Sequence, residues 1–199
     1  MNIFILSNHK LLCVIQNFNP LQPVTTFAQI KRLEDLTTAK VNYYSIQLLS
    51  DQESDENEEN ITLFERFIQK HQGKTEIQDN YEEILDWLEI RMGELFGAKA
   101  KYFRFENESH ALPPPIQFLE GEGDHTLRLY CLRLSDSVVF LFDGGVKTTR
   151  YAQECPNVKD AFYQAGKISK ALTQALKDGD ILWDESGGNI VYDDFDLFF

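Results

Sequence analysis

A pair of adjacent apolar segments in the second half of the chain constrains the fold most. Residues 126–134 and 138–142 are separated by Ser135, Asp136 and Ser137, which are typical turn residues. Two period-two segments with so short a connection form an antiparallel β-hairpin. Leu127, Leu129 and Cys131 alternate with polar residues, so one face of the first strand is apolar. The hairpin therefore predicts a sheet with at least one buried face.

Helical and period-two patterns around this hairpin predict a mixture of helices and strands. Apolar residues recur every three or four positions in the segments 62–70, 79–96 and 158–176. Asp79 followed by Glu82 resembles a capping box, while Gly97 and Gly179 are placed to end the second and third helices. Further strands are expected at 43–49 and 101–105, with a final hairpin of 181–183 and 190–192. We expect an α+β fold.

A length of 199 residues favours one principal domain with appendages. We divide the chain into a poorly defined N-terminal extension (1–40), an α+β domain (41–179) and an acidic C-terminal hairpin or tail (180–199). Within the extension, 3–5 and 11–15 are short candidate strands, and 28–39 is at most a weak helix.

The chain is strongly acidic, with a net charge of −13. Residues 51–59 hold six carboxylates and no base, and 178–199 hold seven carboxylates and neither Lys nor Arg. Such a charge repels nucleic acid over most of the surface. No apolar run is long enough to span a membrane, and no signal peptide is recognisable, so a cytoplasmic location is expected.

Several chemistries lack their usual residues. Cys13, Cys131 and Cys155 are widely spaced, which fits reduced thiols better than disulfides, and Cys131 is expected in the core. The four histidines do not pair at ligand spacing, so we expect no metal site. Neither a glycine-rich phosphate loop nor a Gly-x-Ser-x-Gly elbow is present, and no cofactor is implied.

A few basic and phenolic side chains remain as candidates. Arg128 and Tyr130 share one strand face, and Lys147 follows the next strand beyond a bend at Asp143-Gly144-Gly145. Two cations with a phenol between them, displayed on an open sheet face, could hold a phosphodiester and stabilise charge during its cleavage. The alternative is that Arg128 and Lys147 form ordinary surface ion pairs.

The order of elements and the segment 127–147 resemble the RelE/HigB superfamily of toxins from bacterial toxin–antitoxin modules. Members carry a strand beginning Leu-Arg-Val-x-Tyr, a short turn and an aliphatic strand ending in Lys; here Leu127-Arg128-Leu129-Tyr130 begins the segment and Lys147 ends it. The resemblance implies a small curved antiparallel sheet with two N-terminal helices and one C-terminal helix. It also implies a ribosome-dependent endoribonuclease that cleaves mRNA and is controlled by an antitoxin protein.

Carried over by position, the resemblance implies site residues. Arg128, Lys147 and Tyr130 would be catalytic, and Arg104, Arg133 and Tyr151 would bind RNA.

The acidic charge, and Thr148-Thr149 where the family has further bases, keep a second function open. In that alternative the chain is a non-catalytic protein-interaction module that retains the fold and has lost RNA cleavage. A related hypothesis places the acidic tail over the basic sheet face as an RNA mimic; its alternative is a solvated end packed by its aromatic residues.

Overall fold

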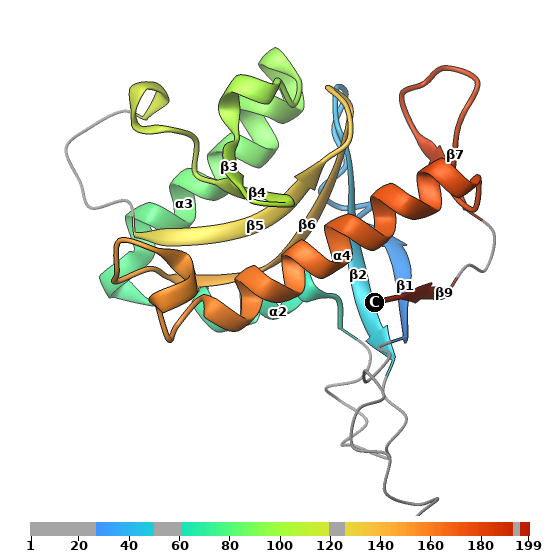
Figure 1. Cartoon of the computed structure of the whole chain (residues 1–199). Helices are drawn as coiled ribbons and strands as arrows, with labels where there is room; N and C mark the ends of the chain where they lie inside the picture. The colour runs from blue at the N-terminus through green and yellow to red at the C-terminus, as the bar shows by residue number, and fades with distance from the viewer. Residues whose placement is uncertain (1–26, 50–60, 120–125, 193–195) are drawn as a thin grey trace, which may run out of the picture.

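The computed structural model describes residues 27–49, 61–119, 126–192 and 196–199 (Figure 1). The α+β class is confirmed. The short strands predicted at 3–5 and 11–15, and the acidic run 51–59, lie outside the described residues. Among the described residues, no helix is both long and apolar enough to cross a bilayer.

One mixed sheet of seven strands forms the centre of the fold, with the order β3-β4-β5-β6-β2-β1-β9. The strands are β1 (Phe27–Arg32), β2 (Asn42–Leu49), β3 (Arg104–Glu106), β4 (Ser109–Leu112), β5 (Leu127–Arg133), β6 (Val138–Val146) and β9 (Asp196–Phe198). β2 and β6 are parallel, while the other neighbours are antiparallel. The expected small, wholly antiparallel sheet is therefore corrected: the sheet is larger, and a parallel pair joins its two antiparallel parts.

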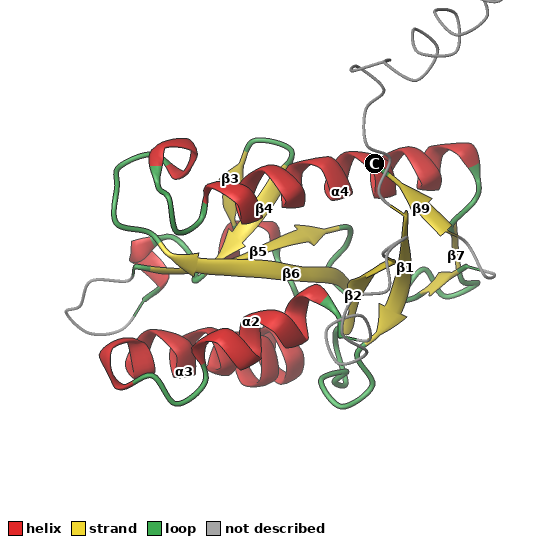
Figure 2. Cartoon of the chain, turned by 90° about the horizontal axis from the view of Figure 1, so that it is seen from below, coloured by secondary structure: helices red, strands yellow, loops and turns green. Residues whose placement is uncertain are grey.

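Helices cover both faces of this sheet, giving three layers (Figure 2). α4 (Lys159–Asp178) lies on one face. The other face carries α2 (Leu63–His71) and α3 (Gln78–Asp86), which continues as a π-helical segment, Trp87–Phe96. The alternation in β5 follows this division: Leu127, Leu129 and Cys131 pack on the α2–α3 side, and Tyr130 packs on the α4 side.

Two helix ends agree with the sequence and one helix start does not. Gly179 ends α4 in the left-handed conformation, with φ of 84°, and Gly97 follows the π-helical segment with φ of 74°. The predicted capping box at Asp79 is wrong, because a 3-10 turn (Thr75–Ile77) precedes α3 and places Asp79 inside the helix. A capping box does start α2, where Thr62 and Glu65 exchange hydrogen bonds.

Two of the predicted elements need correction, and the final hairpin is present. The segment 28–39, expected at most as a weak helix, contains β1, which pairs with β2 and buries Ala28 and Ile30. The strand expected at 101–105 is a 3-10 turn (Ala100–Tyr102) followed by β3. The final hairpin is present as β7 (Leu182–Trp183) and β8 (Ile190–Val191), and β9 then adds to the main sheet beside β1.

Candidate functional site

The glycines at the end of β6 set the backbone beside the candidate arginine. Arg128 is paired with Gly145 and Leu129 with Gly144, and the register then shifts before Cys131 pairs with Leu141. This irregularity is the predicted bend. A Cβ atom on Gly144 would lie 1.8 Å from the carbonyl oxygen of Arg128, so only glycine permits the two strands to approach so closely here.

Arg128 lies inside the protein. Its exposed fraction is 9%, and its Nη1 donates to the carbonyl oxygen of Leu127 at 2.8 Å. Burial lowers its pKa to about 10, and the nearby Arg104 guanidinium adds to the effect while Glu106 opposes it. Because α4 covers this face of β5, the expectation of an open sheet face is wrong.

Tyr130 is also an interior residue. Its side chain is fully buried and its ring meets that of Phe162, on α4, edge to face at 5.9 Å. The phenolic oxygen has no hydrogen-bond partner among the described residues. Burial, and next the charge of Glu106, raise the pKa of this phenol, so it keeps its proton at neutral pH.

Lys147 and Tyr151 lie beyond the end of β6. The backbone N–H of Lys147 donates to the carbonyl oxygen of Thr126 at 2.9 Å, and its Nζ donates to that of Arg150 at 2.7 Å. Tyr151 is 52% exposed, and the Arg150 guanidinium carbon lies 5.4 Å from the centre of its ring. These residues form a surface loop, in which the side chain of Lys147 is hydrogen-bonded to the backbone of Arg150.

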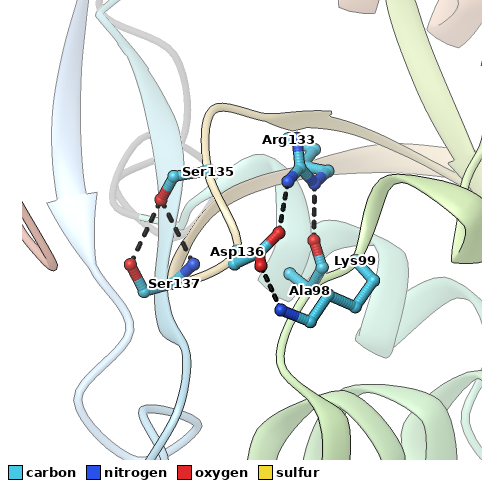
Figure 3. Close-up of polar contacts among 6 residues, drawn as sticks. All are labelled: Ala98, Lys99, Arg133, Ser135, Asp136 and Ser137. Atoms are coloured by element: carbon cyan, nitrogen blue, oxygen red, sulfur yellow. Dashed lines mark hydrogen bonds and ion pairs between the residues drawn. The ribbon is translucent and has the colours of Figure 1, made fainter.

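Arg133 stabilises the turn between β5 and β6 (Figure 3). Its Nε donates to the carbonyl oxygen of Ala98, and its Nη2 pairs with the carboxylate of Asp136. Lys99 pairs with the same carboxylate, and the hydrogen bonds from Lys99 and then Arg133 lower the pKa of Asp136. Arg133 thus connects the hairpin turn to the segment that follows the π-helical residues.

Arg104, on the edge strand β3, is likewise engaged with backbone. Its Nε and Nη2 donate to the carbonyl oxygens of Pro113 and Pro114, each at 2.8 Å. Burial lowers its pKa. The guanidinium thus supplies hydrogen-bond donors to a segment whose prolines have no backbone N–H groups.

The structure therefore brings three of the six candidates together. Arg104, Arg128 and Tyr130 interact electrostatically with one another or with Glu106. A hollow of about 270 Å³ adjoins this group, and its walls include Glu106 and the α4 residues Phe162 and Lys167. Arg133 lies at the other end of β5.

The acidic tail does not take the place expected of an RNA mimic in its described part. β9 extends the sheet at the edge beside β1, whereas β5 lies on the far side of β6 and β2. The helix α4, which carries Phe162, occupies the face in question. For the described residues of the tail, the mimic hypothesis is wrong.

A second hollow, of about 480 Å³, was not predicted from the sequence. It lies between the β1–β2 connection and α2, and its lining residues are Arg32, Leu33, Glu34, Asp35, Leu36, Phe64, Glu65, Ile68 and Gln69. The apolar periodicity of α2 indicated its buried face, but nothing in the sequence indicated that the 33–36 connection would lie beside it. We call this hollow the α2 groove.

No group of three or more potential metal ligands is assembled within the described residues. The fold and these sites define an acidic, three-layered α+β protein. Comparison of the chain with protein-family models, curated proteins and solved structures gave no match.

Proposed function

We propose that this protein acts by binding a partner protein and does not cleave RNA. The observation that carries the proposal is the burial of Arg128 and Tyr130, which are 9% and 0% exposed. Arg128 donates to the carbonyl oxygen of Leu127 in its own strand, and the ring of Tyr130 packs against Phe162 on α4.

Cleavage through the RNA 2′-hydroxyl demands more than buried groups can supply. A general base and a charge-stabilising cation must each come within about 3 Å of the reacting atoms. Arg128 and Tyr130 are both buried, and uncovering Tyr130 would require α4 to leave the sheet, which would expose Phe162, Ala165, Ile168 and Leu172. The net charge of −13 also opposes the approach of RNA.

A partner protein is common to both functions that the sequence leaves open. The RelE/HigB resemblance implies an antitoxin, and the interaction module implies a binding partner of another kind. Membership of that superfamily, and ribosome-dependent mRNA cleavage with it, stay predictions carried by the 127–147 segment.

Induced expression in a bacterial host tests the proposal. Wild type and Lys147→Ala are compared for growth and for new mRNA ends mapped by primer extension. Lys147 is the better residue to change, because its ammonium lies in a surface loop and its removal spares the core. We expect neither form to arrest growth or produce new ends. Growth arrest with new mRNA ends in the wild type, both abolished by Lys147→Ala in a folded protein, would overturn the proposal.

A further inference from the structure

The α2 groove has an apolar floor that the fold leaves partly uncovered. Phe64 is 7% exposed, while Leu33, Leu36 and Ile68 are only half-buried against the core beneath them. These side chains come from two elements that meet only in the folded protein. A partner that inserts an apolar side chain here would remove their remaining surface from water.

Local hydrogen bonds hold the floor in place. The N–H of Leu33 donates to the carbonyl oxygen of Tyr43 at 2.9 Å, and the N–H of Leu36 donates to that of Leu33 at 3.1 Å. On the other wall, Phe64 and Ile68 are four residues apart, so they lie on one face of α2. The groove is thus built from a fixed turn and a capped helix, which lets it receive a ligand without rearrangement.

The rim of the groove is acidic. The residues that line the groove include three carboxylates, those of Glu34, Asp35 and Glu65, and one guanidinium, that of Arg32. Arg32 is already engaged, since its Nη2 donates to Asn42 at 2.7 Å and its Nε lies 3.5 Å from Glu34. An excess of negative charge therefore surrounds an apolar floor.

We propose that the α2 groove is the docking site for a basic partner segment, which inserts large apolar side chains between its lysines or arginines. The apolar floor accepts the anchors and the carboxylate rim attracts the flanking cations. A second copy of this chain is a poor occupant because each copy carries a net charge of −13. This inference rests on the proposed binding function and specifies its surface and the chemistry of its partner.

A peptide titration tests the docking site. The probe is a synthetic amphipathic peptide of leucine and lysine, and its twin has glutamate in place of every lysine. Amide signals of the ¹⁵N-labelled protein are followed during the titration. We expect the lysine peptide to shift the signals of Leu33, Leu36 and Ile68 and the glutamate peptide to shift none.

Two double variants with the same change of net charge separate specific docking from general attraction. Glu34→Lys with Asp35→Lys reverses the rim, whereas Glu108→Lys with Glu185→Lys reverses two exposed carboxylates on other elements. We expect the rim variant to weaken binding of the lysine peptide by about tenfold and the control to retain near wild-type affinity. Leu36→Ala, with folding checked by circular dichroism, should weaken binding without any change of charge.

Other results would overturn the inference. Equal weakening by both double variants, shifts spread over the acidic surface, or equal binding of the two peptides would each show that the groove is not selective. Concentration-dependent dimerisation through the groove would assign it to a second copy. If the peptide does not bind selectively and the expression experiment shows no mRNA cleavage, the docking site is refuted and the proposed function stands. If the expression experiment shows mRNA cleavage, the proposed function is refuted.

Discussion

Replacing Tyr130 with phenylalanine should stabilise the protein. The phenolic oxygen is buried and has no hydrogen-bond partner among the described residues. An unsatisfied buried hydroxyl costs about 1–3 kcal/mol of desolvation, which phenylalanine avoids. The ring itself, and its contact with Phe162, are retained.

The loss of one oxygen atom offsets little of this gain. A void on the order of 15 Å³ costs about 0.4 kcal/mol at roughly 24 cal/mol per Å³. The net gain in unfolding free energy is therefore about 1–2 kcal/mol. For a chain of this length, that gain corresponds to a rise in Tm of about 2–8 °C.

Tyr43 supplies the matched control. It is as fully buried as Tyr130, but its hydroxyl donates to the carbonyl oxygen of Leu88 at 2.6 Å. Tyr43→Phe should therefore lower the unfolding free energy by about 1–2 kcal/mol. Urea unfolding at pH 7, followed by circular dichroism, measures both variants. If Tyr130→Phe destabilises the protein as much as Tyr43→Phe, the reasoning from the unpartnered hydroxyl is refuted.

Two further predictions concern helix glycines and a buried histidine. Gly166→Ala, in α4, should raise the unfolding free energy by about 0.5–1 kcal/mol, because a Cβ there meets no atom within 4 Å. Gly93→Ala should lower it by about 1–3 kcal/mol, because its Cβ would lie 2.7 Å from both the carbonyl oxygen of Leu88 and the Cγ2 of Thr38; chemical denaturation checks the opposite signs. His71 is buried and its pKa is lowered to about 4, first by burial and then by Lys70 and Lys74. Between about pH 6.5 and 4 the unfolded chain binds this proton and the folded chain does not. The unfolding free energy should therefore decrease, by up to about 3 kcal/mol, as the pH is lowered through this window. His71→Phe should remove that contribution from the difference between unfolding curves at pH 7 and 4.5, and an unchanged difference would contradict the assignment.

Local patterns predicted most elements of this fold. The apolar stripes located α2, α3 and α4, and alternation assigned Tyr130 and Leu129 to opposite faces of β5. The glycines that follow Asp143 correctly indicated the irregularity in β6. Each of these features depends on residues close together in the sequence.

Features that depend on distant residues were missed. The parallel pairing of β2 with β6 joins segments almost a hundred residues apart, and no local pattern encodes it. β1 was not recognised because only Ala28 and Ile30 mark its buried face. Parity placed Arg128 and Tyr130 together, but it could not show that both are buried or that Tyr130 packs beneath α4. The catalytic interpretation needed an exposed face, and exposure is a property of the tertiary fold.

The proposed binding function follows from the burial of Arg128, and the chemical reactivity of this arginine measures that burial directly. Arginine modification by phenylglyoxal, quantified by peptide mass spectrometry, compares Arg128 with the exposed Arg150 in the native protein. We predict that Arg150 reacts readily and that Arg128 reacts only when the protein is unfolded. Reaction of both residues at the same rate in the native protein would contradict the account.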